Sequence, residues 1–274
     1  MRHDIIPLSV PGAAAPTELV TYLPDNFPEL GMDRRRPALI LCPGGGYHFR
    51  SDREGEPVAL RFAGLGYAVF LLRYHVAPQG RYPLPQRQLL AAIHHVRTHS
   101  EEYHVDPHAV VTMGFSAGGH LACSAGVLYE NEEILEPLGL TPEACRPDGM
   151  ILGYPVITSG PQAHRGSLEN LLGERYQELL DTVSLEKQVT DATPPVFLWH
   201  TVDDTTVPVE NSLLLQEALE NAGVPAEVHL YPHGVHGQSL ADSTVFSPDR
   251  LWMLSVPCSV WVERCHAWLR RMFG

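Results

Sequence analysis

The stretch Val110–His120 reads V-V-T-M-G-F-S-A-G-G-H, and it decides the fold. It begins with a β-branched, apolar run that is typical of a buried strand, and from Ala117 onward the residues favour a helix. Gly114, Ser116 and Gly118 therefore form a G-x-S-x-G pattern at a strand-to-helix turn, which is the setting of a nucleophilic serine. Such a turn is so sharp that the residues flanking the serine need almost no side chain. We expect the serine hydroxyl to project from the end of a sheet.

Apolar runs of strand length alternate with helical patterns on both sides of this stretch. The expected strands lie at 37–42, 67–72, 150–156, 196–199 and 226–231, and the expected helices at 56–65, 85–100, 117–129, 211–222 and 260–273. A β-α-β-α order predicts an α/β fold with a mainly parallel, twisted sheet and helices on both faces. A chain of 274 residues fits one domain of this kind.

Two segments interrupt the alternation. Residues 1–36 hold two short extended pieces around a P-G-A-A-A-P turn, which predicts an N-terminal hairpin at the edge of the sheet. Residues 157–193 hold polar and helical pieces and no strand pattern. We interpret them as a small cap, or lid, over the carboxyl ends of the strands, where ligands bind in such folds. The predicted organisation is a single domain, 1–274, with this edge hairpin and this cap insertion.

The charge balance limits the classes of partner. Nineteen basic residues stand against 32 acidic ones, so the formal net charge is −13 and neither nucleic acid nor an anionic membrane is an expected partner. No apolar run has the length of a membrane span, and the first residues show no signal-peptide pattern. The cysteines lack C-x-x-C spacing, which indicates reduced thiols in a cytoplasmic protein. They are Cys42, Cys123, Cys145, Cys258 and Cys265.

Fifteen histidines raise the question of a metal site. Five of them fall on one polar stretch that we expect to be helical, and no H-E-x-x-H pattern is present. These five are His94, His95, His99, His104 and His108. We therefore expect no metal ion.

A glycine-rich loop follows the first expected parallel strand. Pro43–Tyr47 reads P-G-G-G-Y, and its glycines leave the backbone N–H groups unobstructed. A flexible turn or a phosphate-binding loop is an alternative, but no G-K-[ST] follows, which excludes a Walker loop. The position matches the second half of an oxyanion hole. We expect the N–H groups of Gly45, Gly46 and Ala117 to be its donors, each typically worth ~2.7–4 kcal/mol of transition-state stabilisation.

A serine nucleophile needs a base, and the base needs a carboxylate that orients it. In this type of fold the chain order is Ser, then Asp or Glu, then His. Asp203 and Asp204 both follow the strand at 196–199, and because neighbouring side chains of extended backbone point opposite ways, only one can face the base. The spacing H-x-x-x-D-x-x-V-P favours Asp204. His236 and His233 compete as the base, and His236, next to a glycine and deeper in its loop, is the predicted one.

Four side chains that follow strand ends are candidates for the substrate pocket. They are Tyr47, His48, Tyr74 and Tyr154. Each could equally pack in the core or at the rim, and the sequence leaves both alternatives open.

Four motifs together resemble the serine α/β-hydrolases, and within them the acetyl-xylan-esterase-like branch that includes bifunctional feruloyl and acetyl esterases. The motifs are P-G-G-G-Y, G-F-S-A-G-G-H-L-A, T-P-P-V-F-L-W-H-T-V-D-D-T-T-V-P-V-E-N-S and G-V-H-G-Q-S-L-A. The likeness spans residues 35–270. It implies an α/β-hydrolase fold and carboxylester hydrolysis through an acyl-enzyme on Ser116, with no cofactor.

The resemblance also implies a small-molecule ester as substrate, commonly an acetylated sugar from plant polysaccharide. In a cytoplasmic protein this would be an imported oligosaccharide. Two other functions stay open. A serine peptidase of the prolyl-oligopeptidase type uses the same triad but usually carries a large additional domain, and a non-catalytic binding or scaffold protein would normally have lost a triad member. A homo-oligomer also stays open.

Overall fold

The computed structural model describes all 274 residues, which form one eight-stranded sheet in the order β1-β2-β4-β3-β5-β6-β7-β8. The strands are β1 (Ile5–Leu8), β2 (Thr17–Tyr22), β3 (Arg36–Cys42), β4 (Ala68–Arg73), β5 (Val105–Phe115), β6 (Gly149–Gly153), β7 (Val196–Thr201) and β8 (Ala226–Tyr231). β1 and β2 pair antiparallel, as do β2 and β4, and every later pair is parallel. The predicted mainly parallel sheet is confirmed.

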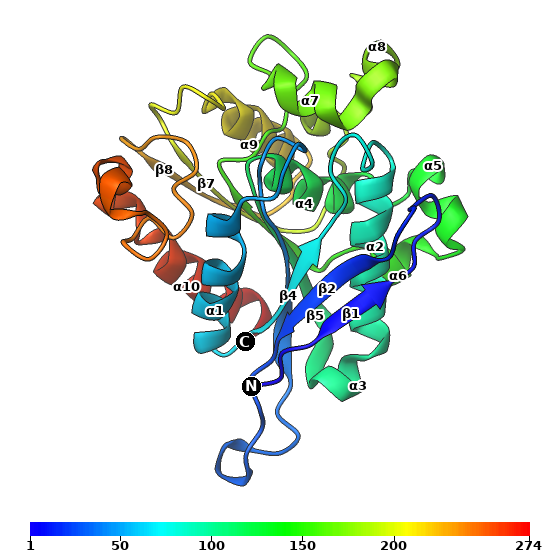
Figure 1. The fold of residues 1–274 in the computed structure, drawn as a ribbon, viewed down its shortest axis with the longest axis vertical. Coiled ribbons are helices and arrows are strands. Elements are labelled where there is room, and N and C mark those ends of the chain that lie inside the picture. Colours follow the sequence, from blue (N-terminus) through cyan, green and yellow to red (C-terminus); the bar gives the residue numbers. More distant parts are fainter.

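Helices cover both faces of the sheet, with α1 and α10 on one side and α2 and α4 on the other (Figure 1). The helices are α1 (Glu56–Gly64), α2 (Leu84–Thr98), α3 (Ser100–Tyr103), α4 (Ala117–Val127), α5 (Glu132–Leu135), α6 (Pro142–Cys145), α7 (Arg165–Leu172), α8 (Tyr176–Leu179), α9 (Glu210–Asn221) and α10 (Trp261–Phe273). None of them combines the length and the apolar character that crossing a membrane requires.

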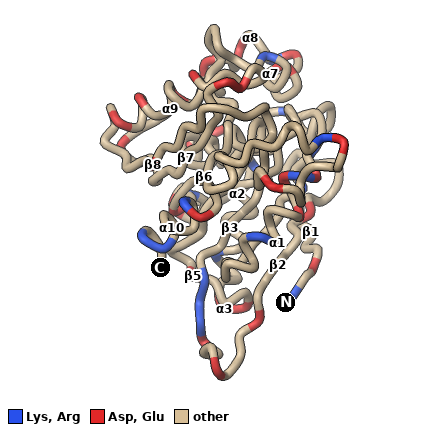
Figure 2. Tube along the Cα trace, turned by 90° about the vertical axis from the view of Figure 1, so that its left-hand side faces the viewer, with Lys and Arg blue, Asp and Glu red and all other residues tan.

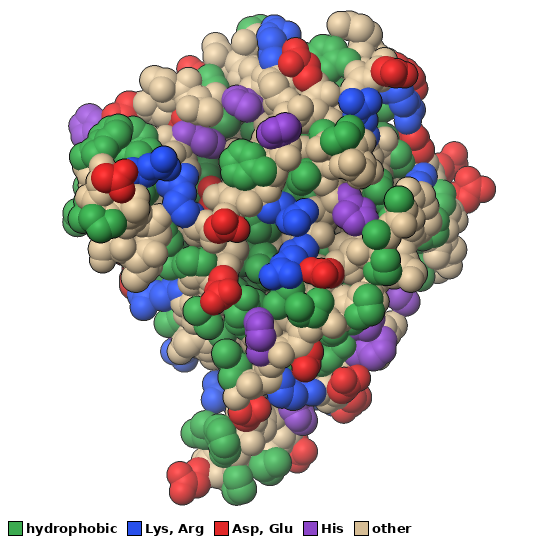
Figure 3. Space-filling view, in the orientation of Figure 1, with side chains coloured by type: hydrophobic (Ala, Val, Ile, Leu, Met, Phe, Trp, Pro, Cys, Tyr) green, Lys and Arg blue, Asp and Glu red, His purple; other side chains and the backbone are tan.

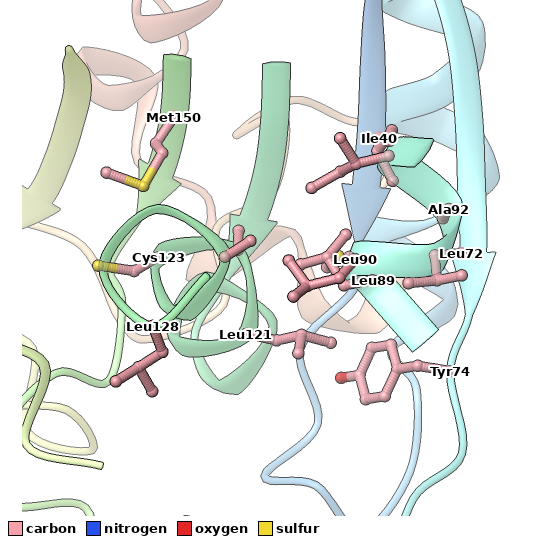
Figure 4. Packing of buried hydrophobic residues seen from close by; sticks show 14 of the residues in the cluster. Ile40, Leu72, Tyr74, Leu89, Leu90, Ala92, Leu121, Cys123, Leu128 and Met150 are labelled. Atoms are coloured by element: carbon pink, nitrogen blue, oxygen red, sulfur yellow. The ribbon is translucent and has the colours of Figure 1, made fainter. Parts of the chain in front are cut away.

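The alternation of side chains along the parallel strands creates two separate cores. In β3, Ala38 and Ile40 join the core beneath α2, α4 and α9, whereas Leu39 and Leu41 join the core beneath α1 and α10. Figure 4 shows the first core, where Leu89 and Leu90 of α2 and Leu121 of α4 pack over the sheet. Both faces of β3 are buried, which is why its sequence from Pro37 to Cys42 is an uninterrupted apolar run.

The two segments that interrupt the β-α alternation lie in different parts of the fold: one forms an edge of the sheet and the other covers one end of the strands. β1 and β2 form a hairpin at the edge of the sheet, where the sequence analysis places it. Residues 157–193 contain α7 and α8 and no strand, and these helices lie above the end of the sheet at which β4 terminates (Figure 1). Acidic residues are scattered along the whole trace, and the longest basic run, Arg34–Arg36, lies at the end of the molecule opposite to α7 (Figure 2).

Three details differ from the sequence-based expectations. β6 ends at Gly153 rather than at residue 156, because Tyr154 turns the chain with a positive φ of 36°. The histidine-rich stretch is not one helix: α2 ends at residue 98, His104 has a φ of 51°, and His108 lies in β5. The short helices α5 and α6 had no recognisable pattern, since four residues hold barely one helical turn.

The turn between β5 and α4 brings backbone segments very close together. Ser116 has φ 54° and ψ −123°, a backbone conformation that L-residues rarely adopt. A Cβ atom on Gly114 would lie 2.0 Å from the Gly118 carbonyl oxygen, and one on Gly118 would lie 2.1 Å from the Cys42 carbonyl oxygen. The two glycines of the motif are therefore required by close backbone contacts.

This geometry predicts that Gly118→Ala lowers the free energy of unfolding by more than about 3 kcal/mol, because the obstructing atom is backbone and cannot move aside. Thermal unfolding followed by circular dichroism measures the effect. Gly64→Ala is the matched control, because a Cβ there meets nothing within 4 Å. A melting temperature of the Gly118 variant equal to that of the wild type would contradict the packing described.

Candidate active site

Three side chains from the ends of three strands meet in one hydrogen-bonded chain. Ser116 follows β5, Asp204 follows β7 and His236 follows β8. The Ser116 hydroxyl lies 2.8 Å from His236 Nε2, and His236 Nδ1 lies 2.6 Å from Asp204 Oδ2. In this arrangement the hydroxyl donates to Nε2, and Nδ1–H donates to the carboxylate. The structure thus brings together the three residues that the sequence analysis singles out as nucleophile, base and acid.

Asp204 is held as a buried carboxylate. Its Oδ1 accepts the N–H groups of Thr206 at 2.9 Å and Val207 at 3.0 Å, and its side chain has no exposed surface. Burial by itself raises the pKa of this carboxyl, but the imidazoles of His200 and His236 and the Val207 N–H lower that pKa by more. The net pKa lies below its usual value, so Asp204 keeps its negative charge and can stabilise a histidine cation.

The neighbouring carboxylate, Asp203, serves its own loop. Its Oδ1 accepts the Gly234 N–H at 2.7 Å, and its Oδ2 lies 3.1 Å from Nδ1 of His233. The side chains of Asp203 and His233 are 51% and 82% exposed, which separates this pair from the buried one. Surface pairs of this kind contribute little to stability.

The N–H groups of the expected oxyanion hole have no hydrogen-bond partner within the protein. Gly45 and Gly46 have φ angles of 121° and 63°, and their N–H groups make no hydrogen bond within the protein. The N–H of Ala117 is likewise unpaired, because Ala117 is the first residue of α4 and the leading N–H groups of a helix have no partner inside it. Both glycines line a cleft together with Ser116 and His236. The three N–H groups of the expected oxyanion hole are thus all available to bind an oxyanion.

A buried glutamate that the sequence analysis missed fixes this loop. Glu54, 3% exposed, accepts the Gly44 N–H at 2.8 Å with one oxygen and the Tyr154 hydroxyl at 2.7 Å with the other. The Tyr154 oxygen in turn accepts the Ser239 N–H at 2.9 Å, and its ring packs edge-on against His236 with the centroids 5.0 Å apart. One carboxylate therefore connects the glycine loop to the loop of the base.

The sequence left pocket lining and core packing open for the three candidate tyrosines, and the structure shows core packing for all three. Tyr47, Tyr74 and Tyr154 are almost completely buried and do not reach the cleft. Each hydroxyl has an internal partner: the Tyr74 hydroxyl donates to the Pro43 carbonyl at 2.6 Å, and that of Tyr47 lies 2.9 Å from His120 Nδ1. They support the loops of the site from beneath. His48, in contrast, does line the cleft.

The cleft over Ser116 has a volume of about 390 Å³. Phe49 is its only apolar residue, and His48, His164 and His236 all border it. Histidine side chains gather on the upper part of the face in Figure 3, near α7. No group of three or more His, Cys, Asp or Glu side chains is arranged to hold a metal ion. A larger cleft of about 810 Å³ lies beyond Ser51, but none of the three hydrogen-bonded residues borders it.

The cap segment, residues 157–193, contributes residues that the sequence gave no reason to select. His164, Gly166 and Asn170 border the cleft. The Asn170 side chain donates to the Gly46 carbonyl oxygen at 2.9 Å, so α7 holds the glycine loop from above while Glu54 holds it from below.

Comparison with known proteins gives the family. The model of the BD-FAE family matches residues 22–219, which include Ser116, Asp204 and the glycine loop. The chain belongs to the BD-FAE family. Two curated relatives are an endo-1,4-beta-xylanase B of Butyrivibrio fibrisolvens, 38% identical over 82% of this chain and 36% of the relative, and an acetylxylan esterase of Xylanibacter ruminicola, 29% identical over 88% of this chain and 48% of the relative. The chain therefore spans less than half the length of either relative.

Solved structures similar to this BD-FAE chain match it from end to end. An acetyl ester-xyloside bifunctional hydrolase from Caldicellulosiruptor lactoaceticus superposes with a TM-score of 0.81 at 37% identity, covering 98% of this chain and 96% of that one. A carboxylesterase from Lactobacillus plantarum gives a TM-score of 0.85 at 28% identity, covering 99% and 98%. The predicted α/β-hydrolase fold and the predicted likeness to acetyl-xylan esterases are confirmed.

The support beneath the site predicts a pH effect on stability. His120 is fully buried: its Nδ1 accepts from Tyr47, its Nε2–H donates to the Val183 carbonyl at 2.9 Å, and burial lowers its pKa from 6.5 to about 4. Between pH 6.5 and about 4, His120 is protonated in the unfolded chain but stays neutral in the folded protein. The free energy of unfolding of the wild type should therefore decrease by about 2 kcal/mol, owing to His120, as the pH falls from about 7.5 to about 5.

His120→Gln retains a donor and an acceptor but does not titrate, so its unfolding free energy should fall less over that pH range. Urea denaturation at the two pH values measures both proteins. The difference between variant and wild type is the quantity of interest, because the other histidines are common to both. Parallel losses in the two proteins would show that His120 does not carry the effect.

Proposed function

We propose that this protein is a serine carboxylester hydrolase that removes acetyl groups from acetylated, xylan-derived sugars. The observation that carries the proposal is the chain of hydrogen bonds from Ser116 through His236 to Asp204, facing the unpaired N–H groups of the glycine loop. A hydroxyl with a base and an oriented carboxylate is the arrangement of an activated nucleophile.

In this mechanism His236 takes the Ser116 proton as the serine oxygen attacks the ester carbonyl carbon. The carbonyl π electrons move to oxygen, and the resulting oxyanion is held by the N–H groups of Gly45, Gly46 and Ala117. The protonated His236 then gives its proton to the leaving sugar oxygen as the C–O bond breaks. Water, deprotonated by His236, attacks the acetyl-serine in the same way, and acetate and the free serine are released.

The side chains that line the cleft support a hydroxyl-rich alcohol, because apart from Phe49 they carry groups that can form hydrogen bonds. The printed names of relatives, an acetylxylan esterase and an acetyl ester-xyloside hydrolase, agree with this substrate class.

The location of the protein stays a prediction. We propose a reducing, cytoplasmic compartment, because all five cysteines are free and buried. Under the proposal the substrate would then be an oligosaccharide brought into the cell. The oligomeric state likewise stays a prediction.

A substrate panel tests the proposed activity. We expect acetate release from acetylated xylo-oligosaccharides, and kcat/KM values for p-nitrophenyl esters that fall from acetate to butyrate to octanoate. Ser116→Ala, the control, should release no acetate from any of them above the background rate. Cleavage of p-nitrophenyl acetate without acetate release from the saccharides would refute the sugar assignment. Efficient cleavage of aminoacyl amides would instead favour a peptidase.

A further inference from the structure

The residue that caps the N-terminus of α7 is held as one tautomer of the neutral imidazole. His164 is the N-cap of α7, and its Nδ1 accepts the Ser167 hydroxyl at 2.8 Å and the Ser167 N–H at 3.3 Å. A ring nitrogen that accepts cannot carry a proton, so the neutral imidazole has its hydrogen on Nε2. Burial, and after it the neighbouring His236, lowers the pKa of His164, which favours this neutral form.

The other ring nitrogen has no partner in the protein. His164 Nε2 makes no hydrogen bond, although the ring is partly buried and borders the cleft with Ser116 and His236. The N–H donor of this tautomer is accessible to solvent and free of hydrogen bonds within the protein, on a residue that lines the cleft.

The position of this donor relative to the nucleophile is fixed by the same helix. Asn170 of α7 donates to the Gly46 carbonyl oxygen, so the helix that carries His164 is attached to the loop that carries the oxyanion donors. A rigidly placed donor can select one orientation of a substrate, whereas a mobile one cannot.

The chemistry of an acetyl ester limits what His164 can bind. The carbonyl oxygen faces the N–H groups of Gly45, Gly46 and Ala117, and the ester alcohol oxygen receives its proton from His236. The acetyl methyl group accepts no hydrogen bond. The acceptors that remain are the hydroxyl and ring oxygens of the sugar itself.

We propose that His164 is a specificity-determining residue whose Nε2–H donates to a sugar oxygen beside the acetylated position and so orients the sugar toward Ser116. This inference rests on the proposed function and deepens it, because it assigns recognition of the alcohol part of the ester to the cap helix. Under this proposal His164 has two roles: Nδ1 caps α7, and Nε2–H binds the sugar.

Two substitutions separate the roles of the two ring nitrogens. Asn at position 164 places its amide oxygen near the site of Nδ1 and caps α7 well, but its side chain is too short to place a donor at the site of Nε2. Gln reaches farther and can place an N–H donor at the site of Nε2, but it is a poorer N-cap. The readouts are the melting temperature and kcat/KM for an acetylated xylo-oligosaccharide and for p-nitrophenyl acetate, whose alcohol part has no hydroxyl groups.

His164→Asn should keep the wild-type melting temperature and lose about tenfold in kcat/KM on the saccharide, the usual effect of one lost neutral hydrogen bond, and should lose clearly less on p-nitrophenyl acetate. His164→Gln should melt lower yet retain more of the saccharide activity than the Asn variant. An Asn variant whose ratio of saccharide to p-nitrophenyl activity equals that of the wild type would overturn the inference. A wild-type enzyme that releases no acetate from the saccharide would overturn the proposed function, and the inference with it.

Discussion

The structure depends on one close backbone approach, where the first turn of α4 passes the end of β3. Gly118 lies so near the Cys42 carbonyl that no side chain fits between them, and Gly114 is constrained in the same way by Gly118. Ser116 has its strained backbone in this turn, and Gly118 also approaches the carbonyl of Pro43, where the glycine loop that follows β3 begins. Nucleophile and oxyanion donors are therefore placed by a single packing constraint, before any polar contact is considered.

Two buried carboxylates hold the glycine loop and the base in position. The Glu54 carboxylate connects the glycine loop to Tyr154 and Ser239, and the Asp204 carboxylate holds the base. Both accept backbone N–H groups, which is how a buried carboxylate offsets its loss of water. The α7 helix closes the site from above through Asn170. The reacting groups are thus held by at least three independent segments, as preorganised electrostatic stabilisation requires.

The sequence allowed the fold and the three hydrogen-bonded residues to be predicted because their signals are local. The G-x-S-x-G turn, the apolar strand runs and the spacing around Asp204 each follow from a few neighbouring residues. Tyr47, Tyr74 and Tyr154 could not be assigned to pocket or core because a tyrosine after a strand can turn inward or outward, and only the tertiary partners of its hydroxyl decide which. Glu54, His164 and Asn170 could not be selected at all. Their partners lie far along the chain or on a short irregular cap, and no periodic pattern marks them.

The most direct test of the central claim is labelling by a fluorophosphonate, which reacts only with a serine that a neighbouring base activates. The account predicts one phosphonyl adduct per chain, located on Ser116 by peptide mass spectrometry, absent in Ser116→Ala and formed far more slowly in His236→Gln. An adduct on another residue, or labelling of the His236 variant at the wild-type rate, would contradict it.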